Sequence, residues 1–278
     1  MSKSHIIAGY GEWGKKIASF LKKQKLFSKV IIFTRNKQFE YYPNFRKITK
    51  KKLKSYFTKT SSVHICTSDN SHLSLLDKFN KLNKSIIVEK PFFHTNYDFK
   101  NIKNTYENKN IIVNYIDLFN PNFSKIKKFI EKNKKTNLNV EILYSYPLKK
   151  NQNFTNYLKT WLDHPLAIIL KLFGFYSIKN KIQFINNKEL NVKYFYDKAL
   201  INIKIKNLKL KKRLIILRNK KNKKEINFLN HSLNKSSFHN LYSSFLKENN
   251  DNRFNLEFNK KIFCEKKFIL TKIKNKKG

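Results

Sequence analysis

The sequence predicts an α/β protein in two parts: a parallel sheet covered by helices, then an α+β domain with a mainly antiparallel open sheet. Three observations predict it. A glycine-rich turn follows the first apolar segment, short apolar runs alternate with helical segments up to about residue 118, and longer segments with apolar–polar alternation follow. We expect residues 1–118 to form one domain and residues 119–278 the second, since 278 residues suffice for two cores.

The first part of the chain alternates apolar runs with segments of helical period. The expected strands are His5–Ala8, Val30–Phe33, Val63–Cys66, Ile86–Val88 and Ile111–Tyr115. The expected helices are Lys15–Gln24, Lys51–Phe57, Ser71–Leu82 and Asp98–Glu107. Strands that are apolar throughout are typical of a parallel sheet with helices on both faces, because both sides of each strand are then buried.

The pattern changes after about Phe119. The segment Ala199–Ile205 alternates apolar residues with Asn and Lys, which predicts a strand with one buried face. The expected helices here are Phe123–Glu131, Asn156–Phe173, Phe238–Lys247 and Leu256–Lys272. Because one-sided strands are typical of antiparallel sheets, we expect the second sheet to be mainly antiparallel.

The chain is strongly basic, with 60 Lys and Arg against 18 Asp and Glu, a formal charge of +42. Such a charge suggests a nucleic-acid partner. However, only five of the 60 basic residues are Arg, the side chain that best recognises phosphates and bases, which argues against such a partner. Lys, Asn, Ile, Phe and Tyr are abundant together while Gly, Arg and Pro are scarce, as an A/T-rich genome would produce. We expect no specific nucleic-acid partner, and a polyanion-binding protein is kept as an alternative.

The two cysteines, Cys66 and Cys264, lie too far apart in the sequence for a metal-binding motif or a disulfide framework. The N-terminal segment reaches glycines before any apolar stretch of signal-peptide length, and no apolar run is long enough to span a membrane. We therefore expect no metal, no membrane partner and a cytoplasmic location.

Three of the five glycines lie in the motif G-x-G-x-x-G, where Gly9, Gly11 and Gly14 enclose Tyr10, Glu12 and Trp13 between the first strand and the first helix. In the Rossmann fold the first glycine permits a tight turn, the second lets the backbone approach a pyrophosphate, and the third lets the helix pack on the strand. We therefore predict a Rossmann dinucleotide-binding domain in which Gly9, Gly11, Glu12, Trp13 and Gly14 contact the cofactor.

The end of the second strand bears on which cofactor binds. Rossmann domains that bind NAD carry an acid there for the ribose 2′-hydroxyl, whereas this strand ends in Phe33-Thr34-Arg35-Asn36. Thr34 and Arg35 are expected to hold a 2′-phosphate instead. The sequence thus favours NADP(H) over NAD(H), with an ordinary surface arginine as the alternative.

Four segments resemble the Gfo/Idh/MocA oxidoreductases, a family named for glucose-fructose oxidoreductase and inositol dehydrogenase. Residues 86–91 read I-I-V-E-K-P, which contains the E-K-P that marks the family after its glycine loop. Residues 65–72 are similar to its I-A-T-P-x-x-x-H turn, residues 113–121 to V-x-Y-x-x-R-F-x-P, and residues 164–174 to H-x-I-D-x-x-x-x-L-x-G.

The resemblance implies hydride transfer between a nicotinamide and a carbinol or carbonyl carbon of a sugar, polyol or nucleotide sugar. It implies that Lys90 and His164 handle the proton, since the reaction needs a group that takes or returns it. It also implies that Thr67, His72, Glu89 and Lys90 lie at the cofactor.

Candidate substrate-binding residues in the resembling segments and the helix before the histidine are Tyr115, Asp117, Asn156, Tyr157 and Asp163. The expected partner is a small molecule, and an anionic sugar nucleotide would be attracted by the lysine-rich surface. A homo-oligomer built on the second sheet, as in the family, is left open.

The chain departs from the family's pattern at several positions. Thr160 stands where the family has Asp four residues before the histidine, and the nearest acid in sequence, Asp163, lies about 100° away around a helix. Ser68 replaces a proline and Leu118 replaces an arginine. These departures leave a second interpretation, a dinucleotide-binding regulatory protein that has lost catalysis.

Overall fold

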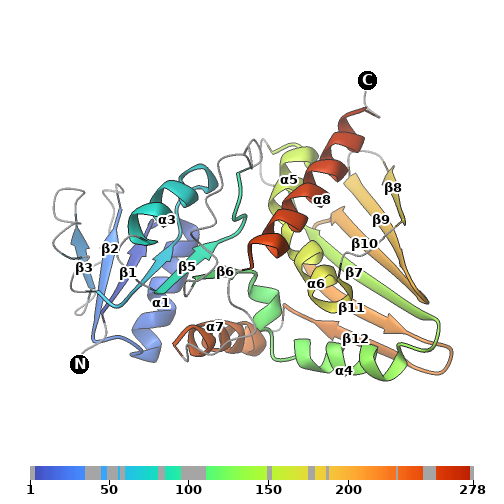
Figure 1. The fold of residues 1–278 in the computed structure, drawn as a ribbon, viewed down its shortest axis with the longest axis horizontal. Helices are drawn as coiled ribbons and strands as arrows, with labels where there is room; N and C mark the ends of the chain where they lie inside the picture. Colours follow the sequence, from blue (N-terminus) through green and yellow to red (C-terminus); the bar gives the residue numbers. More distant parts are fainter. Residues whose placement is uncertain are drawn as a thin grey trace. The chain divides into compact units, whose positions relative to one another are not determined.

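The computed structural model describes residues 4–34, 45–48, 56, 60–80, 85–94, 111–148, 152–174, 179–185, 188–229, 231–246 and 255–275. Contacts within the chain define two compact units, residues 1–114 with 241–259, and residues 115–240 with 260–278. Each unit contains one six-stranded sheet, drawn in Figure 1. The expected division after residue 118 stays a prediction.

The first sheet is parallel in all its described pairings. Its strands are β1 (Ser4–Ala8), β2 (Lys29–Phe33), β3 (Phe45–Ile48), β4 (Ser62–Ile65), β5 (Ser85–Glu89) and β6 (Ile111–Asn114). Their order, β3-β2-β1-β4-β5-β6, is that of a dinucleotide-binding Rossmann domain. This confirms the parallel domain expected from the sequence and adds β3, a strand that the sequence pattern did not predict.

Two helices connect strands of this sheet in the described part of the chain. Helix α1 (Glu12–Gln24) buries Ile17, Ala18, Phe20 and Leu21, and helix α3 (His72–Asn80) follows the short 3-10 helix η1 (Asp69–Ser71). Helix α1 begins one turn earlier than expected, directly at the glycine loop. The expected helix Asp98–Glu107 lies outside the described residues, as does Lys51–Phe57 apart from Tyr56.

The second sheet has the order β12-β11-β7-β10-β9-β8. Its strands are β7 (Leu138–Tyr146), β8 (Lys179–Ile185), β9 (Glu189–Tyr196), β10 (Ala199–Asn207), β11 (Lys212–Arg218) and β12 (Lys223–Asn227). Four described pairings are antiparallel, and the central pair β7–β10 is parallel. The expectation of a mainly antiparallel sheet is therefore corrected to a mixed sheet, because alternation reports that one face is buried but not the direction of the neighbouring strand.

One face of the second sheet packs against helices. Ile201, Ile203 and Ile205 of β10 are fully buried, as the alternation predicted. The remaining elements of this part of the chain are the 3-10 helix η4 (Ile116–Phe119) and helices α4 (Phe123–Asn133), α5 (Phe154–Trp161), α6 (Asp163–Phe173), α7 (His231–Leu246) and α8 (Leu256–Asn275). In the part of the chain that the structure describes, no helix combines the length and apolar character needed to cross a membrane.

The single helix expected over Asn156–Phe173 is divided at Leu162 into α5 and α6. Pro165 lies in the first turn of α6 and lacks the N–H that a continuous helix would direct at the carbonyl of Trp161. Proline is well accepted in the first turn of a helix, where those N–H groups have no partner in the helix. The division therefore follows from Pro165, and the expectation of one continuous helix is wrong.

Candidate functional site

The glycine loop joins β1 to α1 and is packed tightly at two of its three glycines. Gly9 has φ +104°, and a β-carbon there would lie 2.7 Å from the carbonyl of Cys66. A β-carbon at Gly14 would lie 2.2 Å from the carbonyl oxygen of Gly9. A β-carbon at Gly11, in contrast, would meet nothing within 4 Å. Two glycines thus serve the packing of the loop, and the third leaves exposed backbone that a ligand can approach.

The N-cap residue of α1 has no side chain that could bond to the first-turn N–H groups. This residue is Gly11, which provides no side-chain cap at the positive end of the helix, and the acidic residue of the first turn is Glu12. The loop is fixed at its start by a 2.8 Å hydrogen bond from the Gly9 N–H to the carbonyl of Phe33. Trp13 is half-buried with Lys16 Nζ 4.7 Å from its ring centroid, and Glu12 is exposed. This arrangement fits the pyrophosphate of a dinucleotide.

Thr34 follows β2 directly and is half-buried, at the end of the strand next to β1. This is where a Rossmann domain binds the ribose of its cofactor. Arg35 lies outside the described residues, so its role stays a prediction.

His72 connects the turn after β4 with the loop after β5. It is buried, with Nδ1 2.9 Å from the carbonyl oxygen of Pro91 and Nε2 2.9 Å from that of Thr67. Lys90 immediately follows β5 and is half-buried. Because both ring nitrogens of His72 contact backbone carbonyls, this histidine orders the loops beside Thr67 and Lys90. Its direct contact with a cofactor stays a prediction.

Glu89 is the last residue of β5 and lies in a buried hydrogen-bonded cluster. Its Oε1 accepts from Asn114 Nδ2 at 2.6 Å and lies 3.1 Å from His64 Nε2, while His64 Nδ1 lies 2.7 Å from the Tyr242 hydroxyl. His64, Cys66 and Glu89 have potential metal-ligand atoms within 4.8 Å of one another. However, both His64 nitrogens are already engaged, and burial, then the charge of Glu89, raises the pKa of the Cys66 thiol. We therefore interpret the cluster as a set of hydrogen bonds that holds the end of β5 in place, not as a metal site.

The second unit places His164 beside Asp117. His164 lies in the first turn of α6 and Asp117 in η4, and both are buried. His164 Nδ1 is 3.3 Å from Asp117 Oδ2. Asp117 Oδ1 accepts a 2.7 Å hydrogen bond from Arg213 Nη1, and the Tyr144 hydroxyl donates to Oδ2. Two sequence candidates from distant segments are thus brought together with two residues, Tyr144 and Arg213, that sequence reasoning missed.

The charges of this cluster stabilise one another. Burial alone would raise the pKa of Asp117, but the Arg213 guanidinium and the contacts with His164 and Tyr144 outweigh it and hold that pKa well below its usual range. Burial would lower the pKa of Arg213, but Asp117 outweighs this and raises it. Burial and then Asp117 raise the pKa of the Tyr144 hydroxyl. The cluster therefore contains a carboxylate and a guanidinium with a neutral phenol that donates a hydrogen bond.

Aromatic rings enclose the cluster. The Arg213 guanidinium carbon lies 5.4 to 5.8 Å from the ring centroids of Tyr144, Tyr146 and Trp161. Tyr146 stacks on Trp161 at 3.9 Å, and the His164 ring lies 6.2 Å from Tyr144 and 5.9 Å from Trp161. Packing on these rings restricts how the His164 imidazole can turn.

The acid adjacent to His164 faces another partner. Asp163 Oδ2 lies 2.6 Å from Lys266 Nζ of α8, and both side chains are buried. Tyr115 is also buried, and burial, then the charge of Asp163, raises the pKa of its hydroxyl. Asp163 and Tyr115, two of the predicted substrate-binding residues, are therefore close enough for the charge of one to affect the other.

The other two candidates on α5 differ in exposure. Asn156 is exposed, and its backbone N–H donates to the Asn153 side chain, which caps the helix. Tyr157 is buried, and its hydroxyl donates a 3.0 Å hydrogen bond to the carbonyl of Lys206 in β10. Tyr157 thus attaches α5 to the second sheet, and a role in substrate binding stays a prediction for both residues.

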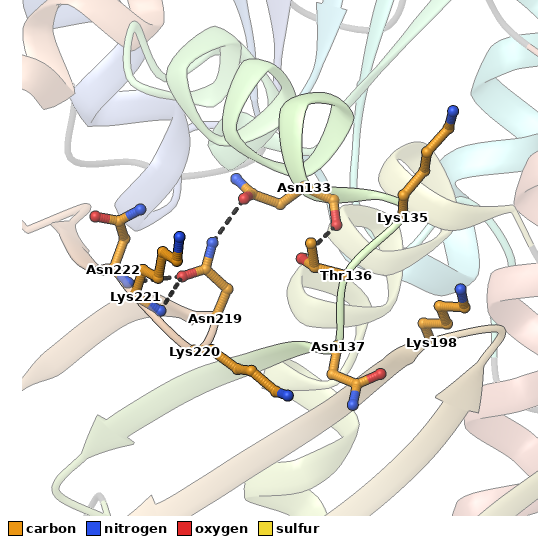
Figure 2. Close-up of a pocket in the computed structure, with 9 residues that line it drawn as sticks. All are labelled: Asn133, Lys135, Thr136, Asn137, Lys198, Asn219, Lys220, Lys221 and Asn222. Carbon is orange, nitrogen blue, oxygen red and sulfur yellow. Dashed lines mark hydrogen bonds between the residues drawn. The ribbon is translucent and has the colours of Figure 1, made fainter.

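A separate hollow of about 490 Å³ lies at the surface of the second unit (Figure 2). Its lining consists of Asn133, Lys135, Thr136, Asn137, Lys198, Asn219, Lys220, Lys221 and Asn222. Asn219 Nδ2 donates to Asn133 Oδ1 at 2.6 Å and joins the turn between β11 and β12 to the end of α4. No site residue predicted from the sequence lines this hollow.

Comparisons with known proteins point to one family. Residues 4–116 match the model of the Gfo/Idh/MocA oxidoreductase family, NAD-binding Rossmann fold. No curated protein sequence matches the chain.

Several solved structures share the whole fold. A myo-inositol dehydrogenase from Corynebacterium glutamicum is 11% identical with a TM-score of 0.71, covering 98% of this chain and 95% of its own. The WlbA dehydrogenase from Thermus thermophilus, solved with NAD and UDP-GlcNAcA, is 11% identical with a TM-score of 0.70 and coverages of 96% and 94%. A Gfo/Idh/MocA family oxidoreductase from Vibrio cholerae is 11% identical with a TM-score of 0.71 and coverages of 99% and 99%. At such identities the likeness shows the fold.

Proposed function

We propose that this protein is an NAD(P)-dependent oxidoreductase, because residues 4–116 match the model of the Gfo/Idh/MocA oxidoreductase family, NAD-binding Rossmann fold. The proposed reaction moves a hydride between the nicotinamide and a carbinol or carbonyl carbon. The proposed substrate is a sugar, polyol or nucleotide sugar. Relatives in fold support this class, since one is a myo-inositol dehydrogenase and another was solved with UDP-GlcNAcA.

The geometry of the glycine loop is the observation that carries the proposal. Gly9 and Gly14 are packed so closely that no side chain fits, and Gly11 leaves the backbone open at the uncapped N-terminus of α1. This combination is what a pyrophosphate requires, because the phosphates bind first-turn N–H groups at the positive end of the helix. A purely structural turn would not need open space at Gly11.

NADP(H) is the cofactor that we propose. Thr34 occupies the position after β2 where NAD-binding domains place an acid, and Arg35 follows it in the sequence. A threonine hydroxyl and a guanidinium can bind a 2′-phosphate, whereas neither supplies the carboxylate that accepts from the ribose 2′-hydroxyl of NAD.

The protein's own residues would handle the proton while the bound nicotinamide supplies or accepts the hydride. Lys90 Nζ, at the carboxyl end of β5, would donate a hydrogen bond to the substrate oxygen and pass it a proton when a carbonyl is reduced. His164 would be the second group that gives or takes this proton. Glu89 and His72 would keep the loop that carries Lys90 in place through their hydrogen bonds.

The test is a screen of oxidised sugars and sugar nucleotides with NADPH and with NADH, followed at the nicotinamide absorbance band. We expect turnover with a member of these classes, a loss of turnover in Lys90→Ala and His164→Ala, and retained cofactor binding in both. Lys127→Ala, which removes an exposed lysine of α4, is the matched control and should turn over like the wild type. Wild-type turnover in Lys90→Ala would contradict the proposed role.

Cofactor choice is tested separately by titration at physiological salt. NADPH should bind more tightly than NADH, and Arg35→Ala should weaken NADPH binding. Equal or tighter binding of NADH would overturn the NADP(H) preference without affecting the proposed reaction.

One observation favours a second candidate, a dinucleotide-binding regulatory protein without catalysis. Thr160 and Leu118 replace an acid and an arginine of the family's pattern, so the usual set of polar groups is incomplete. This candidate predicts tight NAD(P)H binding, no turnover across the screen, and a cellular function that survives Lys90→Ala and His164→Ala.

A further inference from the structure

We propose that Asp117 replaces the carboxylate absent at position 160 and holds the neutral His164 ring with its proton on Nδ1 and its lone pair on Nε2. The inference rests on the proposed function, because it concerns the proton that His164 would handle. It makes Asp117 a positioning residue that acts through His164.

The two sequence positions closest to His164 where an acid was considered, residues 160 and 163, bond to other groups. Thr160 is exposed, and its hydroxyl donates to the carbonyl of Asn156 one turn earlier on α5. Asp163 is committed to Lys266 at 2.6 Å. A carboxylate oxygen of Asp117, 47 residues earlier in the chain, lies 3.3 Å from His164 Nδ1 instead. The fold thus places a carboxylate from η4 at the ring nitrogen.

The Asp117 carboxylate is built to stay ionised and fixed in orientation. Arg213 Nη1 donates to Oδ1, and the Tyr144 hydroxyl donates to Oδ2, the oxygen that also faces His164. A buried carboxylate without such partners would be too costly to keep charged. Arg213 is itself held under the rings of Tyr144, Tyr146 and Trp161. Neither oxygen can turn away from its partner without breaking a charged hydrogen bond.

A carboxylate beside one imidazole nitrogen selects the tautomer. Asp117 accepts but cannot donate, so the neutral His164 ring is stabilised with the proton on Nδ1, which leaves Nε2 as the basic atom. Once Nε2 takes up a proton, the same carboxylate stabilises the imidazolium. The Tyr144 ring, stacked at 6.2 Å, and the tilted Trp161 ring at 5.9 Å pack beside the imidazole and restrict a ring flip that would exchange the two nitrogens. Asparagine at position 117 would keep the shape, but it would remove the charge and could present an N–H to Nδ1.

The test measures the tautomer directly by ¹⁵N NMR of protein labelled at its seven histidines, with His164→Gln to assign the signal. We expect neutral His164 in the wild type to be protonated on Nδ1. In Asp117→Asn the proton should move wholly or partly to Nε2. Asp117→Glu should retain the wild-type tautomer, and so should Glu141→Gln, which removes a carboxylate paired with Lys204 on the same unit's sheet.

A wild-type ring protonated on Nε2 would overturn the proposal, and this result needs no variant to fold. A folded Asp117→Asn with the wild-type tautomer would overturn it as well. Once the screen has found a substrate, Asp117→Asn should lower kcat on the order of 10²-fold while leaving the Kd for NADPH unchanged. An unchanged kcat would overturn the positioning role. The proposed function fails by a different result, no turnover of any member of the screen by the wild type, so the two failures are distinguishable.

Discussion

Gly14 faces the carbonyl oxygen of Gly9 so closely that a β-carbon on residue 14 would lie 2.2 Å from it. The obstacle is backbone, which cannot rotate away as a side chain would. Helix α1 can therefore lie against the end of β1 only with glycine at position 14, and the glycine loop keeps its shape for this steric reason.

Gly14→Ala should lower the free energy of unfolding by about 1 to 3 kcal/mol, because α1 must shift to admit the methyl group. The same shift should weaken NADPH binding. Chemical denaturation and NADPH titration measure the two effects.

Gly11→Ala provides the matched control. Gly11 has φ −80°, and a β-carbon there meets nothing within 4 Å, so the free energy of unfolding should change by less than about 1 kcal/mol. NADPH affinity should still fall, because the methyl group occupies the path of the pyrophosphate. Equal destabilisation by both substitutions would contradict the packing described for the loop.

Asp117 should make stability depend on pH at the acidic end. Burial opposes ionisation, but Arg213, His164 and Tyr144 hold the folded-state pKa well below its usual range. The carboxylate therefore stabilises the folded state above its unfolded pKa of about 4, and this contribution is lost as pH falls from there toward the lower folded value. At pH 7, Asp117→Asn should cost on the order of 3 kcal/mol, because it leaves Arg213 buried without its charge partner.

The difference in unfolding free energy between wild type and Asp117→Asn should shrink between pH 5 and pH 3, which urea titrations at each pH measure. Glu131→Gln is the control, since it breaks an exposed pair with Lys127 and should differ from wild type by less than about 1 kcal/mol at every pH. A difference for Asp117→Asn that stays constant over this range would contradict the assigned charge.

His5 should oppose folding when the pH falls below neutrality. It is fully buried, with Nδ1 2.8 Å from the Ser62 hydroxyl and its ring stacked on Phe27. Burial, then the charge of His64, holds its pKa well below the usual value. The unfolded chain then takes up a proton near pH 6.5 that the folded chain refuses, so stability falls as pH drops through this value.

The expected slope from His5 is at most about 1.4 kcal/mol per pH unit below pH 6.5. His5→Gln cannot be protonated and should flatten the curve of unfolding free energy between pH 7.5 and pH 5.5. His239→Gln, which changes an exposed histidine of α7, should keep the wild-type curve. An unchanged slope in His5→Gln would show that His5 is protonated equally in both states.

The two cysteines should react very differently. Cys66 is buried, and burial together with the charge of Glu89 raises its pKa, so its reactive thiolate is scarce; Cys264 is exposed. Iodoacetamide should label Cys264 in the folded protein and Cys66 only after unfolding, as mass spectrometry of peptides shows. In Cys264→Ser the folded protein should take up almost no label, and rapid labelling of Cys66 in that variant would argue against its burial.

Local patterns were sufficient for much of the first unit. Apolar runs predicted strands β1, β2, β4, β5 and β6, and each is present at nearly the expected residues. A strand buried on both faces leaves a strong pattern in a single short segment, which is why these predictions succeed. Strand β3 (Phe45–Ile48) was not predicted, because Arg46 and Lys47 at its centre interrupt the apolar pattern. It lies at the edge of the sheet.

The polar cluster around Glu89 could have been suspected from the sequence. His64 and Asn114 interrupt otherwise apolar strands, and a polar side chain in such a strand needs a buried partner. Tyr242, which completes the cluster from a distant helix, carries no comparable local sign. Likewise, nothing in the sequence indicates that Arg213, one of the two arginines of β11, has a buried partner.

The sequence by itself determined the Rossmann domain, the glycine loop and the identity of Lys90 and His164 as candidates, because each depends on residues that are close neighbours in the chain. Only the tertiary structure decided that β7 and β10 run parallel, that Asp163 pairs with Lys266, and that Asp117 stands beside His164. The packing of whole helices and strands decides which residues from distant segments become neighbours. A buried charge then needs an oppositely charged neighbour, and only the fold determines which residue that is. Such pairings between distant residues produce no periodic pattern in the sequence.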